Sequence, residues 1–432
     1  MIKIYNSSEI DKSEILSRSG QNDLEKAEKT VREIISDVRA RGDVAVKEYT
    51  LRFDGCDISD MRVTEKEIDE AFVNVGDYFI DTLKAAAANI SEYHLKQKRE
   101  GFTIKRPDGT VLGQRILPVL RAGVYVPGGT AAYPSTVLMD VIPAVVAGVK
   151  EIVMVTPPDK NGRIKDEILA AARIAGVTEI YKAGGAQAVA ALAYGTESIK
   201  RTDKIVGPGN IYVAAAKKAV SGDVGIDMFA GPSEILIIAD ETAVPDYLAA
   251  DLLSQAEHDR LASAVLVCTD ASVAQKTADC IEKRLEKLPR REIAAHSIEN
   301  NGKIILVKNL DEATEISDAL APEHLEIMTA DPQSVLAKVR NAGSVFLGKW
   351  SPEPIGDYFA GPNHTLPTSG TARFSSPLGV DDFVKRSSYI SYSRAALIEN
   401  GERVADFAKR EGLDAHARSI EARLSDTYGE EK

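Results

Sequence analysis

The sequence is poor in the residues that mark several common classes of protein. Its 432 residues include only three cysteines, Cys56, Cys268 and Cys280, which form neither a metal-binding spacing nor an even set for disulfides. No apolar run is long enough to cross a membrane, and the N-terminus lacks the basic start and apolar stretch of a signal peptide. These absences predict a reduced, cytoplasmic protein.

Positive charge is also outnumbered by negative charge. There are 53 Lys and Arg residues against 65 Asp and Glu residues, which gives a formal net charge of −12. Such an acidic chain disfavours nucleic acid or an anionic membrane surface as a partner. The composition, 44% hydrophobic and 27% charged, is ordinary for a globular protein. The length predicts two or three domains.

Several catalytic and nucleotide-binding motifs are missing. The chain has no G-x-G-x-x-G, no Walker loop, no G-x-S-x-G and no H-E-x-x-H. It has instead three glycine-containing turns, each between a predicted strand and a predicted helix: 126–129, 183–187 and 206–210. Glycine at such a turn lets backbone N–H groups approach a phosphate. Ordinary tight turns are the alternative, and three in succession favour a nucleotide-type cleft.

From about residue 120 onward, short apolar runs alternate with alanine-rich helical stretches. The predicted strands are 123–126, 151–155, 179–181, 204–206, 234–238, 264–267 and 303–307, with weaker candidates at 325–328 and 344–347. Alternating strands and helices predict βαβ units and parallel sheets. Ligands of such sheets bind beyond the carboxyl ends of the strands.

We therefore expect an α/β fold with two Rossmann-like parallel-sheet domains. The first, at 119–233, carries the three glycine turns, and the second spans 234–380. A helical region at 1–118 precedes them, because apolar residues recur there at helical spacing. A helical tail at 381–432 follows, and a polar tail of this kind often docks on another subunit.

Histidine is scarce, and four of the six histidines lie in polar segments near glycine or proline: His258, His324, His364 and His416. Histidine is the commonest metal ligand and titrates near neutral pH, so this placement favours an enzyme. Glu323 directly precedes His324, and such a pair offers two bases of different strength. A structural histidine beside a helix-capping glutamate is the alternative.

Other candidate ligands are ambiguous when taken singly. Gln255 and His258 lie three apart on a predicted helix and share a face, which suits zinc, although a histidine also fits the dipole at a helix end. Asp357, beside a glycine, is equally typical of a turn. His416 is equally typical of a helix surface.

Seven segments together resemble the histidinol dehydrogenase family. They are 123–129 (GVYVPGG), 230–234 (AGPSE), 251–258 (DLLSQAEH), 321–325 (APEHL), 356–358 (GDY), 362–364 (PNH) and 370–376 (GTARFSS). The resemblance runs from about residue 25 to 424 and keeps the order of the family's motifs. It implies a zinc-dependent, four-electron oxidation of L-histidinol to L-histidine, the last step of histidine biosynthesis. The reaction uses two NAD and one water and passes through bound L-histidinal.

The resemblance also assigns roles to residues. It implies Glu323 and His324 as catalytic bases, and it places Zn²⁺ on Gln255, His258, Asp357 and His416. Ser233, His364 and Glu411 join these ligands and His324 as substrate-binding residues. Tyr125, Gln187 and Asn210 match the NAD contacts. The family is a homodimer in which the C-terminal tail crosses over, so Glu411 and His416 would complete the neighbour's site. His94 and His296 are expected outside it.

Three alternatives follow from the same residues. A related zinc- and NAD-dependent dehydrogenase would act on another small alcohol, such as a sulfonated diol. A zinc-dependent hydrolase would need no dinucleotide. A metal-binding protein without catalysis would bind zinc without turnover.

Overall fold

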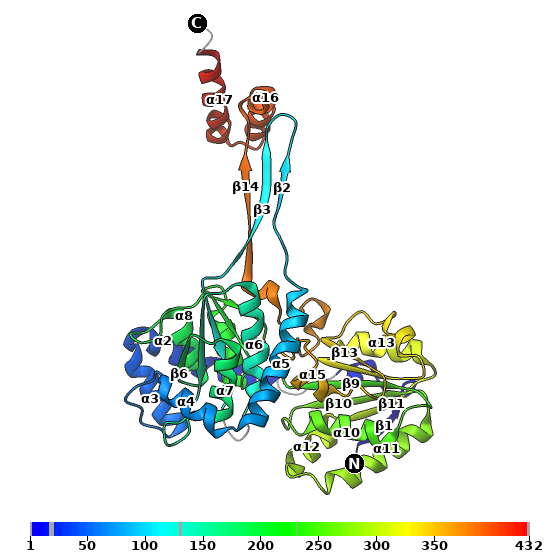
Figure 1. Cartoon of the computed structure of the whole chain (residues 1–432). Coiled ribbons are helices and arrows are strands. Elements are labelled where there is room, and N and C mark those ends of the chain that lie inside the picture. The colour runs from blue at the N-terminus through cyan, green and yellow to red at the C-terminus, as the bar shows by residue number, and fades with distance from the viewer. Residues whose placement is uncertain (1, 17–20, 129–131, 230, 430–432) are drawn as a thin grey trace. The chain divides into compact units, whose positions relative to one another are not determined.

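The computed structural model describes residues 2–16, 21–128, 132–229 and 231–429. These residues form two compact units. We call Met1–Gln97 with Val119–Phe383 the body, and Lys98–Pro118 with Val384–Lys432 the tail unit (Figure 1). No helix in the described ranges is both long and apolar enough to span a membrane.

The first sheet of the body is fully parallel and has the order β6-β5-β4-β7-β8. Its strands are β4 (Arg121–Tyr125), β5 (Glu151–Thr156), β6 (Glu179–Lys182), β7 (Lys204–Val206) and β8 (Gly225–Ile226). The connecting helices are α6 (Pro134–Ala147), α7 (Asp166–Ala175), α8 (Gly185–Tyr194) and α9 (Ile211–Val220). From β4 the chain continues through β5 to β6 on one side of the sheet. It then crosses to β7, which pairs with β4 on its other side. The carboxyl ends of β4 and β7 therefore flank a topological switch point, where such sheets bind ligands.

N-terminal helices pack against this first sheet and its helices. They are α2 (Gln21–Arg41), α3 (Asp43–Asp54), α4 (Glu65–Asn74) and α5 (Asp77–Leu95). Val31, Ile34 and Val38 follow one face of α2 at helical spacing and are buried in a cluster with the alanines of α8. Short side chains on α8 let the helices approach closely.

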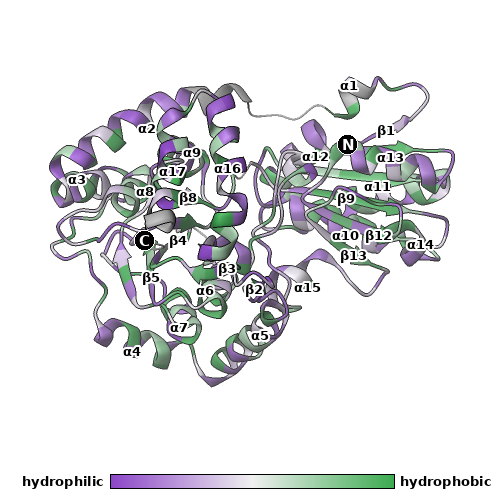
Figure 2. Cartoon of the chain, turned by 90° about the horizontal axis from the view of Figure 1, so that it is seen from above, coloured by the Kyte–Doolittle hydropathy of each residue, from purple (hydrophilic) through white to green (hydrophobic). Residues whose placement is uncertain are grey.

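The second sheet is also fully parallel, in the order β1-β11-β10-β9-β12-β13. Its strands are β1 (Lys3–Asn6), β9 (Glu234–Ala239), β10 (Ser263–Cys268), β11 (Lys303–Leu306), β12 (His324–Met328) and β13 (Ser344–Leu347). Every residue of β9 is buried, as expected for a strand covered on both faces (Figure 2). The helices of this half are α1 (Lys12–Ile15), α10 (Pro245–Ala256), α11 (Ala271–Leu285), α12 (Arg291–Asn301), α13 (Leu310–Leu320), α14 (Pro332–Leu336) and α15 (Glu353–Tyr358).

The tail unit combines an antiparallel sheet with a pair of helices. The sheet has the order β14-β3-β2, formed by β2 (Phe102–Lys105), β3 (Val111–Pro118) and β14 (Val384–Ser391). The chain then continues into α16 (Arg394–Arg410) and α17 (Asp414–Gly429) (Figure 1). The hydroxyl of Ser393 accepts a hydrogen bond from the backbone N–H of Ala396 and so caps α16. Nearly all of β14 is exposed.

The expected α/β fold with parallel sheets and helical terminal regions is confirmed, and all nine predicted strands are present. Two details were wrong. The region 1–118 is not wholly helical, because it contains β1, β2 and β3. The tail begins with a strand, β14, before its helices. The domain boundaries given above stay a prediction.

Candidate active site

The candidate site lies at the amino-terminal edge of the second sheet. His324 is the first residue of β12 and is in register with Ile235, the second residue of β9. Gln255 approaches the same edge from the last turn of α10, which runs back from the carboxyl end of β9. This candidate site therefore lies at the opposite edge from the carboxyl ends of the strands, whereas the glycine turns of the first sheet follow strand ends.

One side of the His324 ring faces β9 and α10. Its Nδ1 lies 3.1 Å from the carbonyl oxygen of Glu234 and 3.2 Å from Nε2 of Gln255. The carboxylate of Glu323 lies 3.5 Å from the same nitrogen and accepts a 2.8 Å hydrogen bond from the Glu234 N–H. The imidazole is only 3% exposed. Backbone groups of β9 therefore hold both members of the predicted base pair in place.

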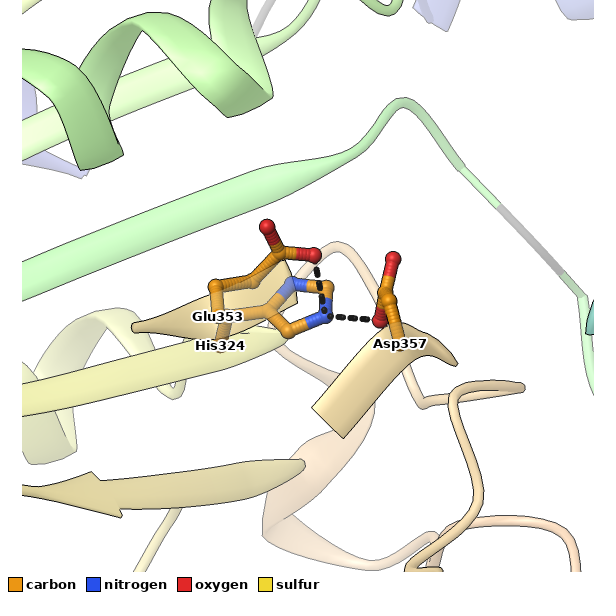
Figure 3. Close-up of side chains that lie close together, drawn as sticks. All are labelled: His324, Glu353 and Asp357. Atoms are coloured by element: carbon orange, nitrogen blue, oxygen red, sulfur yellow. Dashed lines mark ion pairs between the residues drawn. The ribbon is translucent and has the colours of Figure 1, made fainter. Parts of the chain in front are cut away.

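The other side of the ring faces two carboxylates from α15 (Figure 3). Nε2 lies 3.5 Å from Oδ1 of Asp357 and 3.7 Å from Oε1 of Glu353. Glu353 and Asp357 are four residues apart on one helix, so they project from the same face. Nε2 of His324 and Oε1 of Glu353 make no hydrogen bond within the described part of the chain. The site therefore presents a free ring nitrogen between two acids.

Burial and the charges of neighbouring side chains shift the pKa values of His324, Glu353 and Asp357. Burial disfavours the charged ring, but the carboxylates of Glu323 and Asp357 outweigh it and raise the pKa of His324 well above the usual value. Burial and the neighbouring Asp357 raise the pKa of Glu353 to about 9. Burial opposes ionisation of Asp357, yet its contacts with the two histidines lower its pKa. A cation bound beside Asp357 would weaken its hold on the His324 proton.

Two further carboxyl groups lie behind this cluster. Oε1 of Glu326 accepts a 2.8 Å hydrogen bond from the backbone N–H of Glu353 and so holds the start of α15. Burial raises the pKa of Glu326 well above its usual value and that of Asp251 to about 6. Sequence reasoning missed Glu353, Glu326 and Asp251. Alternating positions in a strand and a buried helix face were the only signals, and neither is specific to chemistry.

The four predicted zinc ligands differ in burial and in the elements that carry them. Gln255 is buried, and its Oε1 has no hydrogen-bond partner among the described residues. Asp357 lies in the cluster beside His324. His258 is exposed in a turn, because α10 ends at Ala256; the expected helical face shared with Gln255 is therefore wrong. His416 is exposed on α17 of the tail unit.

The side chains that come together as a possible metal group are a different set. Within the described residues, one ligand atom each from His324, Glu353 and Asp357 lie within 4.8 Å of one another. This group shares only Asp357 with the predicted ligands. Buried histidine and carboxylates without a cation are costly, so the group of His324, Glu353 and Asp357 is a second candidate metal site.

The predicted substrate residues lie on several segments. Nδ1 of His364 is 4.0 Å from Oδ1 of Asp357, and burial lowers the pKa of His364. Both residues line a cavity of about 290 Å³ with Phe346, Ile355 and Leu366. Ser233 directly precedes β9, and its carbonyl oxygen accepts from the Ser263 N–H. Glu411 is exposed at the end of α16 in the tail unit.

The three predicted dinucleotide residues lie on the glycine turns of the first sheet. The hydroxyl of Tyr125, at the end of β4, accepts a 3.0 Å hydrogen bond from the N–H of Gly185. Gln187 is buried in the first turn of α8, and its Oε1 has no hydrogen-bond partner among the described residues. Asn210 caps α9 by accepting from the N–H groups of Tyr212 and Val213. Residue 129, the last of the first turn, lies outside the described residues, as do residues 130 and 131.

Gly128 and Gly184, from two of these turns, both lie close to Pro157, which follows β5. A Cβ added to Gly128 would lie 2.3 Å from Cγ of Pro157, and one added to Gly184 would lie 2.6 Å from its Cβ. Only glycine fits at such approaches. The 126–129 and 183–187 turns are thereby packed together at the carboxyl edge of the sheet.

Comparisons with known proteins show the family of the chain. The sequence model of the family Histidinol dehydrogenase matches residues 17–424. The chain is 56% identical to histidinol dehydrogenase of Geobacillus kaustophilus over 409 residues, which cover 95% of this chain and 96% of the relative. It is also 56% identical to that of Bacillus subtilis over 408 residues, covering 94% and 96%. The crystal structure of histidinol dehydrogenase from Elizabethkingia anophelis superposes with a TM-score of 0.93 at 38% identity, covering 99% of each chain.

The two parallel sheets and the buried histidine among carboxylates define an α/β enzyme, and the matches make it an NAD-dependent oxidoreductase. The chain belongs to the histidinol dehydrogenase family. The expected family is confirmed.

Proposed function

We propose that this chain oxidises L-histidinol to L-histidine with two NAD and a bound zinc ion, as the last step of histidine biosynthesis. The observation that carries the proposal is the buried Glu323–His324 pair, held by β9 with Gln255 and Asp357 beside it. Two bases beside an amide and a carboxylate suit an oxidation that removes protons at two stages. We place the reaction in the cytoplasm, as the sequence predicts.

The donor set of the predicted zinc site fits the metal. Oε1 of Gln255 is a buried oxygen without a hydrogen bond in the described ranges, and Asp357 supplies a carboxylate. Zinc accepts imidazole and oxygen ligands in a four-coordinate site. We assign Gln255, His258 and Asp357 of one subunit, with His416 of the other, as its ligands. When bound, zinc would orient the imidazole and amine of the substrate, while NAD accepts hydride in each oxidation.

The residues of the chain then divide the proton transfers. In the first oxidation the alcohol carbon loses hydride to NAD, and His324 takes the hydroxyl proton, which yields L-histidinal. Glu323 removes a proton from water as its oxygen adds to the aldehyde carbon. Before the second oxidation His324 releases its proton to solvent. The hydrated aldehyde then loses hydride to a second NAD while His324 takes one hydroxyl proton, which yields the carboxylic acid, and this acid ionises to the carboxylate of L-histidine. A placed base contributes roughly 10²–10⁴ in rate.

The first sheet is the side on which NAD would bind. Tyr125, Gln187 and Asn210 lie on or beside its three glycine turns, and the buried amide oxygen of Gln187 has no hydrogen-bond partner among the described residues. The glycine turns before α8 and α9 would hold the pyrophosphate, because glycine lets backbone N–H groups approach a phosphate. Ser233, His364 and Glu411 are assigned to the substrate.

We also propose a homodimer in which each tail unit completes the active site of the other subunit. The tail unit exposes large apolar side chains on its sheet and helices: Phe102, Ile104, Ile390, Ile398, Val404, Phe407 and Leu413. Apolar side chains exposed to water do not stabilise a monomer, whereas a partner subunit would cover them and remove them from water. Glu411 and His416 are exposed in the same unit, as residues that serve a neighbour would be.

The decisive test measures the stoichiometry of the reaction. Purified protein would be incubated with L-histidinol and NAD, with NADH followed by absorbance and L-histidine by chromatography. The proposal expects two NADH for each L-histidine formed and little free L-histidinal. No NADH, or release of the aldehyde after a single NADH, would contradict it.

A further inference from the structure

The segment that carries His364 is fastened to α6 of the first half of the body. The amide nitrogen of Asn363 donates a 2.5 Å hydrogen bond to the carbonyl oxygen of Met139, and its amide oxygen accepts from the Thr365 N–H at 2.8 Å. The hydroxyl of Thr365 donates to Oδ1 of Asp140 at 2.7 Å. Both neighbours of His364 are therefore held by consecutive residues of one helix.

A third anchor comes from α5. His94, which was expected outside the site, is fully buried, and its Nε2 lies 3.5 Å from the amide nitrogen of Asn363. Its Nδ1 lies 2.8 Å from Oε1 of Gln97, which also accepts a hydrogen bond from the Val380 N–H. The backbone around His364 thus has little freedom to shift.

Asp140 also reaches the glycine turn that follows β7. Gly207 has a φ of +113°, and a Cβ added there would lie 3.1 Å from Oδ2 of Asp140 and 2.1 Å from the carbonyl oxygen of Tyr125. The turn is itself fixed: the Gly207 N–H donates to Oδ2 of Asp227 at 2.8 Å, and Nζ of Lys217 donates to the Gly207 carbonyl at 2.9 Å. Asp140 therefore lies close beside the predicted dinucleotide side and is hydrogen-bonded to the segment of His364.

The surroundings of Asp140 are unfavourable for a carboxyl group. It is completely buried, and its Oδ2 makes no hydrogen bond to any described residue. A carboxyl group in such surroundings costs folding free energy that an apolar residue of the same size would not. Packing alone gives no reason for an acid here, and a role in holding two segments does.

We propose that Asp140 is a positioning residue that fixes His364 through the Thr365 hydroxyl and fills the space beside Gly207, which limits how far the 207–210 turn can move toward α6. One buried side chain would thereby set the distance between the substrate and dinucleotide sides of the active site. This inference rests on the proposed function, because His364 and the turn are assigned to substrate and NAD there.

The test compares Michaelis constants for the two substrates. Thr365→Val keeps the shape of the side chain and removes the hydrogen bond, so the KM for L-histidinol should rise roughly tenfold while the KM for NAD stays unchanged. Asp140→Ala should raise both constants by a similar factor. Asp140→Asn keeps an oxygen that can accept from Thr365, so its KM for L-histidinol should return to within about threefold of wild type.

A matched control is Thr277→Val, because Thr277 is equally buried and its hydroxyl donates only within α11, to the carbonyl of Val273. It should leave both Michaelis constants unchanged. The double variant with Asp140→Ala and Thr365→Val should show no higher KM for L-histidinol than Asp140→Ala alone, since both changes break one hydrogen bond.

The outcomes separate the inference from the proposed function. Unchanged Michaelis constants with a lower kcat in the Asp140 variants would indicate a merely structural role and overturn the inference. If Asp140→Ala does not fold, Thr365→Val still decides it: an unchanged KM for L-histidinol overturns it. Wild-type protein that does not oxidise L-histidinol would overturn the proposed function and this inference together.

Discussion

The two nitrogens of His324 have different surroundings, and this difference decides what the residue can do. Nδ1 is fixed by donating to the Glu234 carbonyl oxygen, whereas Nε2 has no hydrogen bond within the described ranges and faces Asp357 and Glu353. A ring that is anchored through one nitrogen keeps its orientation while the other exchanges a proton. Nε2 is therefore the atom that we expect to act as the base.

Zinc content distinguishes the proposed ligands from the group formed by His324, Glu353 and Asp357. His258→Asn removes a proposed ligand, so zinc retained after dialysis should fall at least tenfold. His324→Asn should retain zinc and lose most turnover. The control is His296→Asn, which changes an exposed histidine on α12 that contacts the Arg260 carbonyl.

The opposite result for zinc content would indicate a different metal site. Zinc lost from His324→Asn but kept by His258→Asn would place it among His324, Glu353 and Asp357, and the assigned role of His324 would then be wrong. Metal would be measured by atomic absorption on dialysed protein of known concentration.

Asp140 should make the stability of the protein depend on pH. Burial raises the pKa of Asp140 to about 8, above about 3.9 in an unfolded chain. The folded state thus holds the proton more tightly, and stability is greatest below the unfolded pKa. It is lost as pH rises towards 8, by up to about 1.4 kcal/mol per pH unit from this group. Above the folded pKa the loss from this group is complete.

Asp140→Asn should flatten this dependence, because an amide does not titrate. Urea unfolding of wild type and variant at pH 6 and pH 8 would measure it, with Asp279→Asn on the exposed face of α11 as the control. A variant that loses as much stability between the two pH values as wild type would contradict the assignment. The Asp279 variant should follow wild type.

Sequence reasoning found site residues where a family motif surrounds them and missed those defined by distant contacts. Gln255 and Asp357 were ambiguous singly and were chosen through the resemblance. Asp140 was missed because its partner Thr365 is 225 residues away in the chain. No local spacing predicts such a pair, since the fold alone brings α6 beside the 363–365 segment.

At the scale of elements, the predicted strands were those with continuous apolar runs. Strands buried on both faces, such as β9, consist of such runs and were therefore predicted from the sequence. β1 is four residues long and pairs with β11 some three hundred residues later, and β14 is exposed along nearly its whole length. Neither pattern gives an apolar run or an alternation, so both strands were missed.

Helix α9 is tied to the 207–210 turn through a buried ion pair. The side chains of Lys217 and Asp227 are 2% and 0% exposed and form a salt bridge, and Lys217 also donates to the Gly207 carbonyl. Lys217→Met would leave Asp227 buried without a counter-charge, and we expect a loss of about 3–5 kcal/mol in the free energy of unfolding. Chemical denaturation would measure it.

The neighbouring Lys218 offers a matched control on the same helix. Its side chain is 52% exposed and pairs with Glu28 at the surface. Lys218→Met should cost less than about 1 kcal/mol. Equal losses in the two variants would show that the buried pair has no special part in holding the turn. The KM for NAD should rise only in the Lys217 variant, because its effect passes through Gly207.

At the scale of the whole molecule, the tail unit holds two predicted site residues and much exposed apolar surface. Obligate interfaces between subunits resemble a divided core, and a sheet with exposed aromatic and aliphatic side chains fits that description. If the tails exchange, activity depends on subunit association. Specific activity should then fall on dilution below the dissociation constant of the dimer.

Complementation between inactive variants tests whether the active sites are shared. His416→Asn changes a residue of the tail unit, and His324→Asn changes one of the body. In a mixed dimer, one site combines the intact body of the first variant with the intact tail of the second. Coexpression with random pairing should therefore recover about a quarter of wild-type activity.

A second pair of variants supplies the control. His324→Asn and His364→Asn both lie in the body, so every site of their mixed dimer carries one damaged residue and no activity should return. Each variant alone sets the background, and size-exclusion chromatography with light scattering confirms that mixed dimers form. If the tail served its own subunit, the His416 and His324 pair would fail in the same way as the control. Recovery in the first pair alone requires that each site be built from two chains.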